Sequence, residues 1–216
     1  MKTYCTSKAT LSALILTIGA ALAVSAGPVQ PVDWIALPFP IDSNWGASQG
    51  MPAEISDSEI ILQGQDARTQ QVYAWGVTIE CDVSLEERAA NDGSFDLYIL
   101  PPDLPLDLTP VRFPFTKFRI IYSNTGDYGS VDRLNVEQGN GVVAGTPWTK
   151  IPFPVQAWAN YHVTVRVSLS GRLRITINGQ RYLIPRKGRI RYQQFQFQLG
   201  GWQPGNRWHV RNFVVR

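Results

Sequence analysis

The chain has 216 residues, of which 44% are hydrophobic and 17% are charged. This composition excludes a disordered or collagen-like chain and supplies enough apolar side chains for one sizeable core. Residues 27–137 carry 17 acidic and 6 basic side chains, whereas residues 138–216 carry 12 basic and no acidic ones. Because the two halves nearly cancel, the overall charge predicts neither a nucleic-acid partner nor a membrane-surface partner.

The first 26 residues have the pattern of a secretory signal peptide. Lys2 and Lys8 give a positive start, residues 11–24 an uncharged apolar run, and Val24-Ser25-Ala26 a small-residue cleavage site. The apolar run is shorter than the roughly 20 residues that cross a bilayer. We therefore expect cleavage before Gly27, no membrane span in the mature protein, and a secreted or periplasmic location.

The first strands are predicted at residues 59–63 and 75–86. From residue 75 to 86, apolar and polar residues alternate without interruption, which is typical of a half-buried strand. Cys81 falls on the apolar side, and the mature chain has no second cysteine, so we expect a buried, unpaired thiol. A short helical turn is predicted at residues 85–91.

Two further strands are predicted at residues 94–100 and 115–123. The five prolines between residues 101 and 114 predict a surface loop between them. Beyond the second strand, oxygen-bearing side chains could hold calcium, although their spacing matches no known calcium loop: Asn124, Asp127, Asp132 and Asn135. We predict no cofactor, with calcium as the alternative, and the few His and Cys residues argue against zinc.

The C-terminal third contains the clearest strand pattern, at residues 161–169, 172–177, 193–199 and 208–215. Ser170-Gly171 and Asn178-Gly179 predict two tight hairpins, the second of type I′. With roughly ten strands and short turns, the chain is expected to form two packed antiparallel sheets. No linker or repeat follows Pro31, so residues 27–216 are predicted to form a single domain.

The charge segregation has two interpretations. If the two halves interleave in one sandwich, acidic and basic strands become neighbours and neutralise each other through cross-strand pairs. If the basic half forms its own face, a cluster near residue 189 would attract an acidic polysaccharide. That cluster consists of Arg186, Lys187, Arg189 and Arg191. The first interpretation is favoured, because the strands read as one sandwich.

Residues 158–182, W-A-N-Y-H-V-T-V-R-V-S-L-S-G-R-L-R-I-T-I-N-G-Q-R-Y, resemble the central hairpin of laminin-G-like and concanavalin A-like domains. The closing segments, F-Q-L-G-G-W at 197–202 and W-H-V-R-N-F-V-V at 208–215, are similar to the last strands of that fold. The resemblance implies an all-β fold, a two-sheet antiparallel jelly-roll sandwich of concanavalin A-like type. It also implies a protein that binds or cleaves carbohydrate outside the cytoplasm, but fold analogy supplies no site.

Catalytic motifs of the superfamily are only partly matched. Its laminarinase-type glucanases carry E-x-D-x-x-E or E-x-D-x-E on one strand, and the nearest match here consists of Glu80, Asp82 and Glu86. The third carboxylate is displaced: along a regular strand Glu80 and Glu86 lie about 20 Å apart, against ~5–5.5 Å for a retaining pair. The galectin pattern H-x-N-x-R and the opening signature of 3-keto-disaccharide hydrolase domains are not seen.

Aromatic side chains are the remaining candidates for a binding site, because sugar C–H faces pack on indole rings. Trp202 is expected at a loop tip beside Gln203 and Asn206, and Trp148 is placed similarly between Pro147 and Thr149. The sequence therefore predicts a secreted, monomeric, non-catalytic carbohydrate-binding domain. One alternative is a glycoside hydrolase, glucanase-like or 3-keto-disaccharide hydrolase-like. The other is a structural or adhesion module that contacts a protein.

Overall fold

The computed structural model describes residues 29, 32–37, 51–102, 104–105, 114–124, 131–140, 146–182, 189–202 and 206–216. These residues form strands and connecting segments without a helix, and no helix among them could cross a membrane. The predicted signal peptide, residues 1–26, lies outside the described residues.

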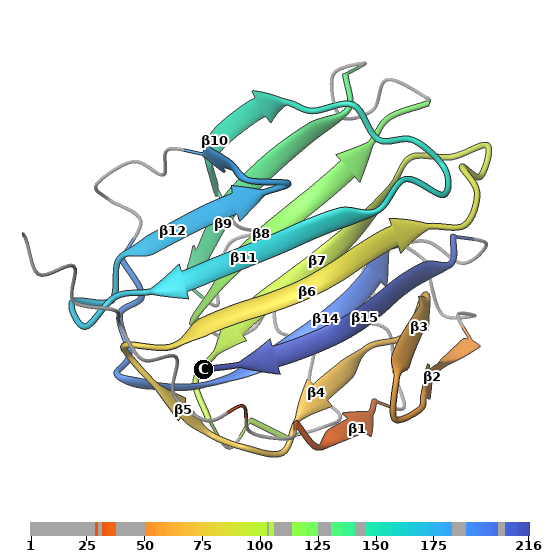
Figure 1. Ribbon diagram of the computed structural model, residues 1–216. Helices are drawn as coiled ribbons and strands as arrows, with labels where there is room; N and C mark the ends of the chain where they lie inside the picture. The colour runs from red at the N-terminus through yellow and green to blue at the C-terminus, as the bar shows by residue number, and fades with distance from the viewer. Residues whose placement is uncertain are drawn as a thin grey trace, which may run out of the picture.

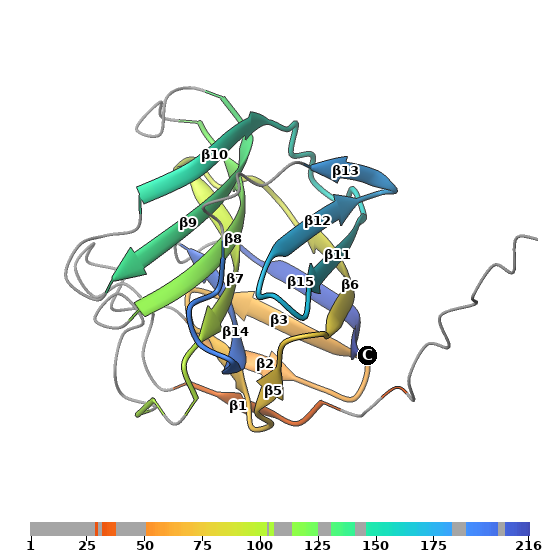
Figure 2. The ribbon, with the colours of Figure 1, turned by 90° about the vertical axis from the view of Figure 1, so that its left-hand side faces the viewer.

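Two antiparallel sheets pack against each other as two layers (Figures 1 and 2). The eight-stranded sheet has the order β1 (Trp34–Ala36), β4 (Ala67–Thr69), β14 (Gln194–Trp202), β7 (Gly93–Leu100), β8 (Pro114–Tyr122), β9 (Arg133–Asn140) and β10 (Thr146–Pro152), with β5 (Tyr73–Ala74) also paired to β14. The seven-stranded sheet has the order β13 (Gln180–Tyr182), β12 (Leu173–Ile177), β11 (Tyr161–Val167), β6 (Thr78–Leu85), β15 (Trp208–Val215), β3 (Glu59–Gln63) and β2 (Met51–Ile55).

The last two strands of the chain complete the two sheets from their middle. β14 lies between β4 and β7, and β15 lies between β3 and β6, so each inserts between strands formed much earlier in the sequence. This order makes the fold a jelly-roll sandwich, as predicted. It also places first-half and second-half strands side by side.

The core lies between the sheets and is built from alternate residues of the strands. Strand β6 contributes Ile79, Cys81, Val83 and Leu85, each at most 1% exposed. Burying side chains of this kind contributes about 1.5–3 kcal/mol each. The predicted burial of Cys81 is confirmed, and burial raises the pKa of its thiol.

Both predicted hairpins are confirmed. Gly171 has φ of 72°, and an added Cβ would lie 2.8 Å from the Trp75 indole. Both the backbone conformation and the lack of space therefore require glycine at this turn. Asn178 and Gly179 have φ of 49° and 79°, the positive pair that a type I′ turn demands. The second turn joins β12 to β13.

The helical turn predicted at residues 85–91 is wrong, because tertiary contacts fix this segment in an irregular conformation. Arg88 donates to the Asp132 carboxylate at 2.8 Å and to the Val155 carbonyl at 3.0 Å, and it lies 4.9 Å from the Tyr122 ring centre. Seven of the described strands, both short and long, are not among the strands predicted from the sequence pattern. These are β1, β2, β4, β5, β9, β10 and β13.

Candidate functional site

The eight-stranded sheet carries polar side chains on the face that points away from the core. The strand register aligns them in rows, with Asp96 opposite Arg119 and Arg119 opposite Asn135. We call this set the polar face: Arg68 on β4, Gln198 on β14, Ser94, Asp96 and Tyr98 on β7, Lys117 and Arg119 on β8, and Asn135 and Glu137 on β9. All nine residues are less than one-tenth exposed.

Four ionised groups form a closed quartet at the centre of the polar face. Arg119 lies 2.8 Å from Asp96 and 3.5 Å from Glu137, while Lys117 lies 3.7 Å from Asp96 and 3.3 Å from Glu137. Burial raises the pKa of Glu137, but Arg119 and Lys117 outweigh it, so the pKa lies below its ordinary value. Burial lowers the pKa of Arg119, but the opposing effect of Asp96 and Glu137 is larger, so this pKa lies above its ordinary value. The quartet therefore holds two acidic and two basic side chains at fixed positions.

Two buried polar atoms of the polar face have no hydrogen-bond partner among the described residues. One is Oδ1 of Asn135, whose Nδ2 donates to Glu137 at 3.3 Å. The other is Nη2 of Arg68, whose Nε donates to Gln198 at 2.8 Å. A buried polar atom left without a partner costs about 1–3 kcal/mol. Arg68 on β4 and Asn135 on β9 stand at opposite sides of the polar face, and a ligand hydroxyl could supply the hydrogen bond that either atom lacks.

One end of the polar face carries apolar cover. Leu104 packs against the buried cluster of Tyr98, Leu100 and Phe115, and its carbonyl accepts a 2.7 Å hydrogen bond from Arg68 Nη1. The ammonium of Lys117 lies 4.9 Å from the ring centre of Tyr98. Aromatic rings therefore lie directly beside the charged quartet.

The three candidate catalytic carboxylates lie on the other sheet, on the outer surface of β6 and just beyond its end. Each has its own partners: Glu80 pairs with Arg216 at 3.1 Å, Asp82 with His162 at 2.8 Å, and Glu86 with Arg207 at 3.0 Å. Burial raises the pKa of Asp82, but its hydrogen bonds with Asn212 and His162 have a larger opposing effect. The pKa of Asp82 therefore lies below its ordinary value. The structure therefore gives each of these carboxylates its own basic partner.

These ion pairs confirm the favoured interpretation of the segregated charge. Acidic residues of the first half face basic residues of the second half across neighbouring strands, and Glu59 with Arg211, at 2.6 Å, is a further example. Arg186 and Lys187 of the basic cluster lie outside the described residues.

The predicted sugar-binding residues fall at different places. Asn206 is completely buried, and its side-chain oxygen accepts hydrogen bonds from the Tyr122 hydroxyl and from the Ala89 amide at 3.3 Å. Trp202 ends β14, and Trp148 lies in β10 where the pairing with β9 shifts register. The side chains of both tryptophans, and all of Gln203, lie outside the described part of the chain.

The predicted calcium ligands have other roles where they are described. Asp132 accepts hydrogen bonds from Arg88 and from the amides of Ser123 and Val155, the last two at 2.9 Å. Asn135 belongs to the polar face, and Asp127 lies outside the described residues. Among the described residues, no group of three or more His, Cys, Asp or Glu side chains could hold a metal ion.

Sequence reasoning missed the polar face, although its signal is present. Charged or amide residues alternate with core residues in D-L-Y at 96–98, K-F-R at 117–119 and N-V-E at 135–137. Alternation shows that each triplet has one wet side. It does not show that the three wet sides adjoin, because that depends on the order β7, β8, β9.

Comparisons with known proteins identify the fold. The sequence matches no family model and no curated protein. A carbohydrate binding module, CBM66, from Bacillus subtilis superposes with a TM-score of 0.53 at 11% identity, over 85% of this chain and 94% of that one. The Emp47p carbohydrate recognition domain superposes with a TM-score of 0.59 at 14% identity, over 83% and 93%.

The fold is the concanavalin A-like jelly roll. A β-glucanase from Bacillus licheniformis is also similar, with a TM-score of 0.55 at 9% identity, over 86% of this chain and 91% of that one. The fold class and the resemblance derived from residues 158–215 are thus confirmed. At such low identity the concanavalin A-like likeness concerns the fold alone.

Proposed function

We propose that this protein binds a carbohydrate on the polar face without cleaving it. The observation that carries the proposal is the fixed quartet of charges with the unfilled Oδ1 of Asn135 beside it. Sugar hydroxyls both donate and accept hydrogen bonds, and a rigid array of carboxylate, guanidinium and amide groups matches them without reorganisation. Similar solved structures that are named as a carbohydrate binding module and a carbohydrate recognition domain support this class of ligand.

The surroundings of the two carboxylates in the quartet favour binding over cleavage. A glycoside hydrolase needs a carboxylic acid with a raised pKa to protonate the leaving oxygen. Glu137 has a lowered pKa, and Asp96 contacts both Arg119 and Lys117. A carboxylate held by two cations is a good hydrogen-bond acceptor and a poor proton donor.

A glycan-array screen of the protein at low and high salt tests binding, with released reducing sugar assayed on every hit. Binding without release is expected. Release of sugar would favour the hydrolase alternative, for which the structural similarity to a β-glucanase is the reason. If the array gives no signal, carbohydrate binding is excluded for the glycans tested and the protein-contact alternative leads.

Substitution of Asn135 tests the assignment to the polar face. Asn135→Ala removes the unfilled Oδ1, so affinity for an array hit should fall about tenfold, as expected for one lost hydrogen bond of roughly 1–1.5 kcal/mol. Asn160→Ala, an exposed asparagine beside the other sheet, is the matched control and should leave affinity unchanged. Equal affinity of the Asn135 variant and the control, with both thermally stable, would place the ligand elsewhere.

The proposed ligand fits a protein that works outside the cytoplasm. This location rests on the signal-peptide pattern of residues 1–26. N-terminal sequencing of the exported protein should begin at Gly27. An intact Met1 in the exported protein would contradict cleavage.

A further inference from the structure

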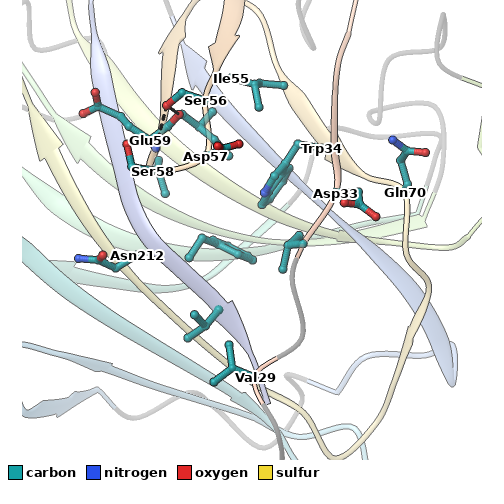
Figure 3. Close-up of a pocket in the computed structure, with 15 residues that line it drawn as sticks. Val29, Asp33, Trp34, Ile55, Ser56, Asp57, Ser58, Glu59, Gln70 and Asn212 are labelled. Carbon is teal, nitrogen blue, oxygen red and sulfur yellow. Dashed lines mark hydrogen bonds between the residues drawn. The ribbon is translucent and has the colours of Figure 1, made fainter.

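An open pocket of about 710 Å³ lies at an edge of the sandwich, away from the polar face (Figure 3). It is formed by β1, the turn between β2 and β3, and the bulged part of β15. Ligand sites in proteins commonly enclose about 300–1,000 Å³. The pocket therefore has room for one or two sugar rings.

The indole ring of Trp34 is held rigidly in the pocket wall. It meets Phe213 edge to face, with the ring centres 4.8 Å apart, and Phe213 in turn lies 6.4 Å from the core residue Phe197. Phe213 takes this place because β15 shifts register after Arg211, where Asn212 has φ of 51°. Such a bulge redirects the following side chain.

The polar groups of the pocket are one-sided in charge. Three carboxylates line it, Asp33, Asp57 and Glu59, and no lysine, arginine or histidine is among the described residues of its lining. Burial raises the pKa of Glu59, but His209 and Arg211 outweigh it, so the pKa lies below its ordinary value. An acidic sugar would be repelled here, whereas a cationic group would be attracted.

Asp57 is presented to a ligand by a locally fixed turn. Ser56 Oγ accepts a 3.1 Å hydrogen bond from the Glu59 amide and donates to the Glu59 carbonyl at 2.9 Å, which locks the turn with exposed Asp57 at its tip. In Figure 3 the Trp34 ring lies on the Asp57 side of β1, whereas the Asp33 carboxylate lies on the other side of that strand and accepts a 2.8 Å hydrogen bond from Gln71 Nε2. Asn212 and Ser58 add an amide and a hydroxyl to the same pocket.

We propose that this pocket binds an amino sugar that carries a free ammonium group. The ammonium lies over the Trp34 ring beside Asp57, where the ring and the carboxylate both attract a cation. The C–H face of the sugar packs on the indole, and its hydroxyls bond to Asn212 and Ser58. This site is distinct from the polar face and does not depend on the function proposed for that face.

Titration calorimetry with three oligosaccharides of equal length tests the proposal. A glucosamine oligomer should bind about tenfold more tightly than its N-acetylated form, which has lost the charge, and added salt should narrow this gap. A galacturonic acid oligomer should not bind in the pocket. Equal affinity for the free and N-acetylated oligomers would overturn the proposal.

Matched variants then locate the site. Asp57→Asn should abolish the preference for the free amine, and Trp34→Ala should weaken both amino-sugar oligomers about tenfold. Two control variants lie outside the pocket: Glu87→Gln removes an exposed charge and Trp158→Ala removes a 63% exposed indole. Both should bind the oligomers as the unchanged protein does.

If Trp34→Ala fails to fold, the proposal is tested by Asp57→Asn, which lies on an exposed turn. An unchanged preference of that variant for the free amine would overturn the proposal. Asn135→Ala should leave this binding intact, which separates it from the polar face.

Discussion

At the scale of the residue, two buried carboxyl groups on the same side of the eight-stranded sheet show opposite behaviour. Glu137 is paired with Arg119 and Lys117, and these cations hold its pKa below the ordinary value against the effect of burial. Asp66 is 2% exposed and accepts a 2.7 Å hydrogen bond from Gln198, but burial dominates and raises its pKa well above 3.8. The immediate partners of a carboxyl group thus decide whether burial leaves it charged.

Asp66→Asn should therefore stabilise the protein at high pH. When folding raises the pKa of a carboxyl group, the folded protein loses stability as the pH rises from the pKa in the unfolded chain through the pKa in the folded protein. Asparagine mimics the protonated carboxyl group and avoids this loss. Above the raised pKa we expect the variant to gain roughly 1–2 kcal/mol, and in acid to match the unchanged protein. Urea unfolding across pH measures this, and a variant less stable at every pH would contradict it.

At the scale of the element, the hairpin between β12 and β13 shows how local sequence determines local structure. Asn178 and Gly179 both adopt positive φ, which few other residues tolerate. His162 lies across from this turn, and its amide donates to Asn178 Oδ1 at 2.8 Å. This hydrogen bond connects the turn between β12 and β13 to the neighbouring strand β11.

Replacing Gly179 with alanine isolates the backbone cost of this turn. An added Cβ would meet no atom within 4 Å, so no steric clash contributes. Gly179→Ala should lower the free energy of unfolding by about 1 kcal/mol, because alanine disfavours positive φ. Asn178→Gly keeps the backbone conformation accessible but removes the side-chain hydrogen bond, so comparing the two by urea unfolding separates the contributions. An unchanged stability in Gly179→Ala would show that the turn can relax.

At the scale of the whole molecule, the segregated charges of the sequence become neighbours. On the outer surface of the seven-stranded sheet, Glu59, Glu80, Asp82 and Glu86 of the first half meet basic partners of the second half. Each exposed pair contributes little. Together they neutralise a surface that would otherwise repel itself.

The thermal midpoint should fall when the pH drops below about 4.5. Glu59 and Asp82 have pKa values below their ordinary 4.5 and 3.8, so their contribution is present above those values and is lost as the pH falls through the lowered ones. The combined Glu59→Gln and Asp82→Asn variant should start with a lower midpoint and lose less in acid. Both proteins should be compared in the Asp66→Asn background, because protonation of Asp66 acts in the opposite direction. Parallel acid profiles would contradict the assignment.

The sequence by itself determined the strands with clear alternation, the apolar side of each, the burial of Cys81 and the two tight turns. These depend on residues close together along the chain, where alternation and positive φ act locally. Only the tertiary structure decided that Asp96, Arg119 and Glu137 share one face, and that Trp34 meets Asp57 and Asn212 at one pocket. The first set comes together because β7, β8 and β9 pair in that order, and the second because β15 inserts beside β3, next to the turn that carries Asp57. No local pattern specifies which strands become neighbours.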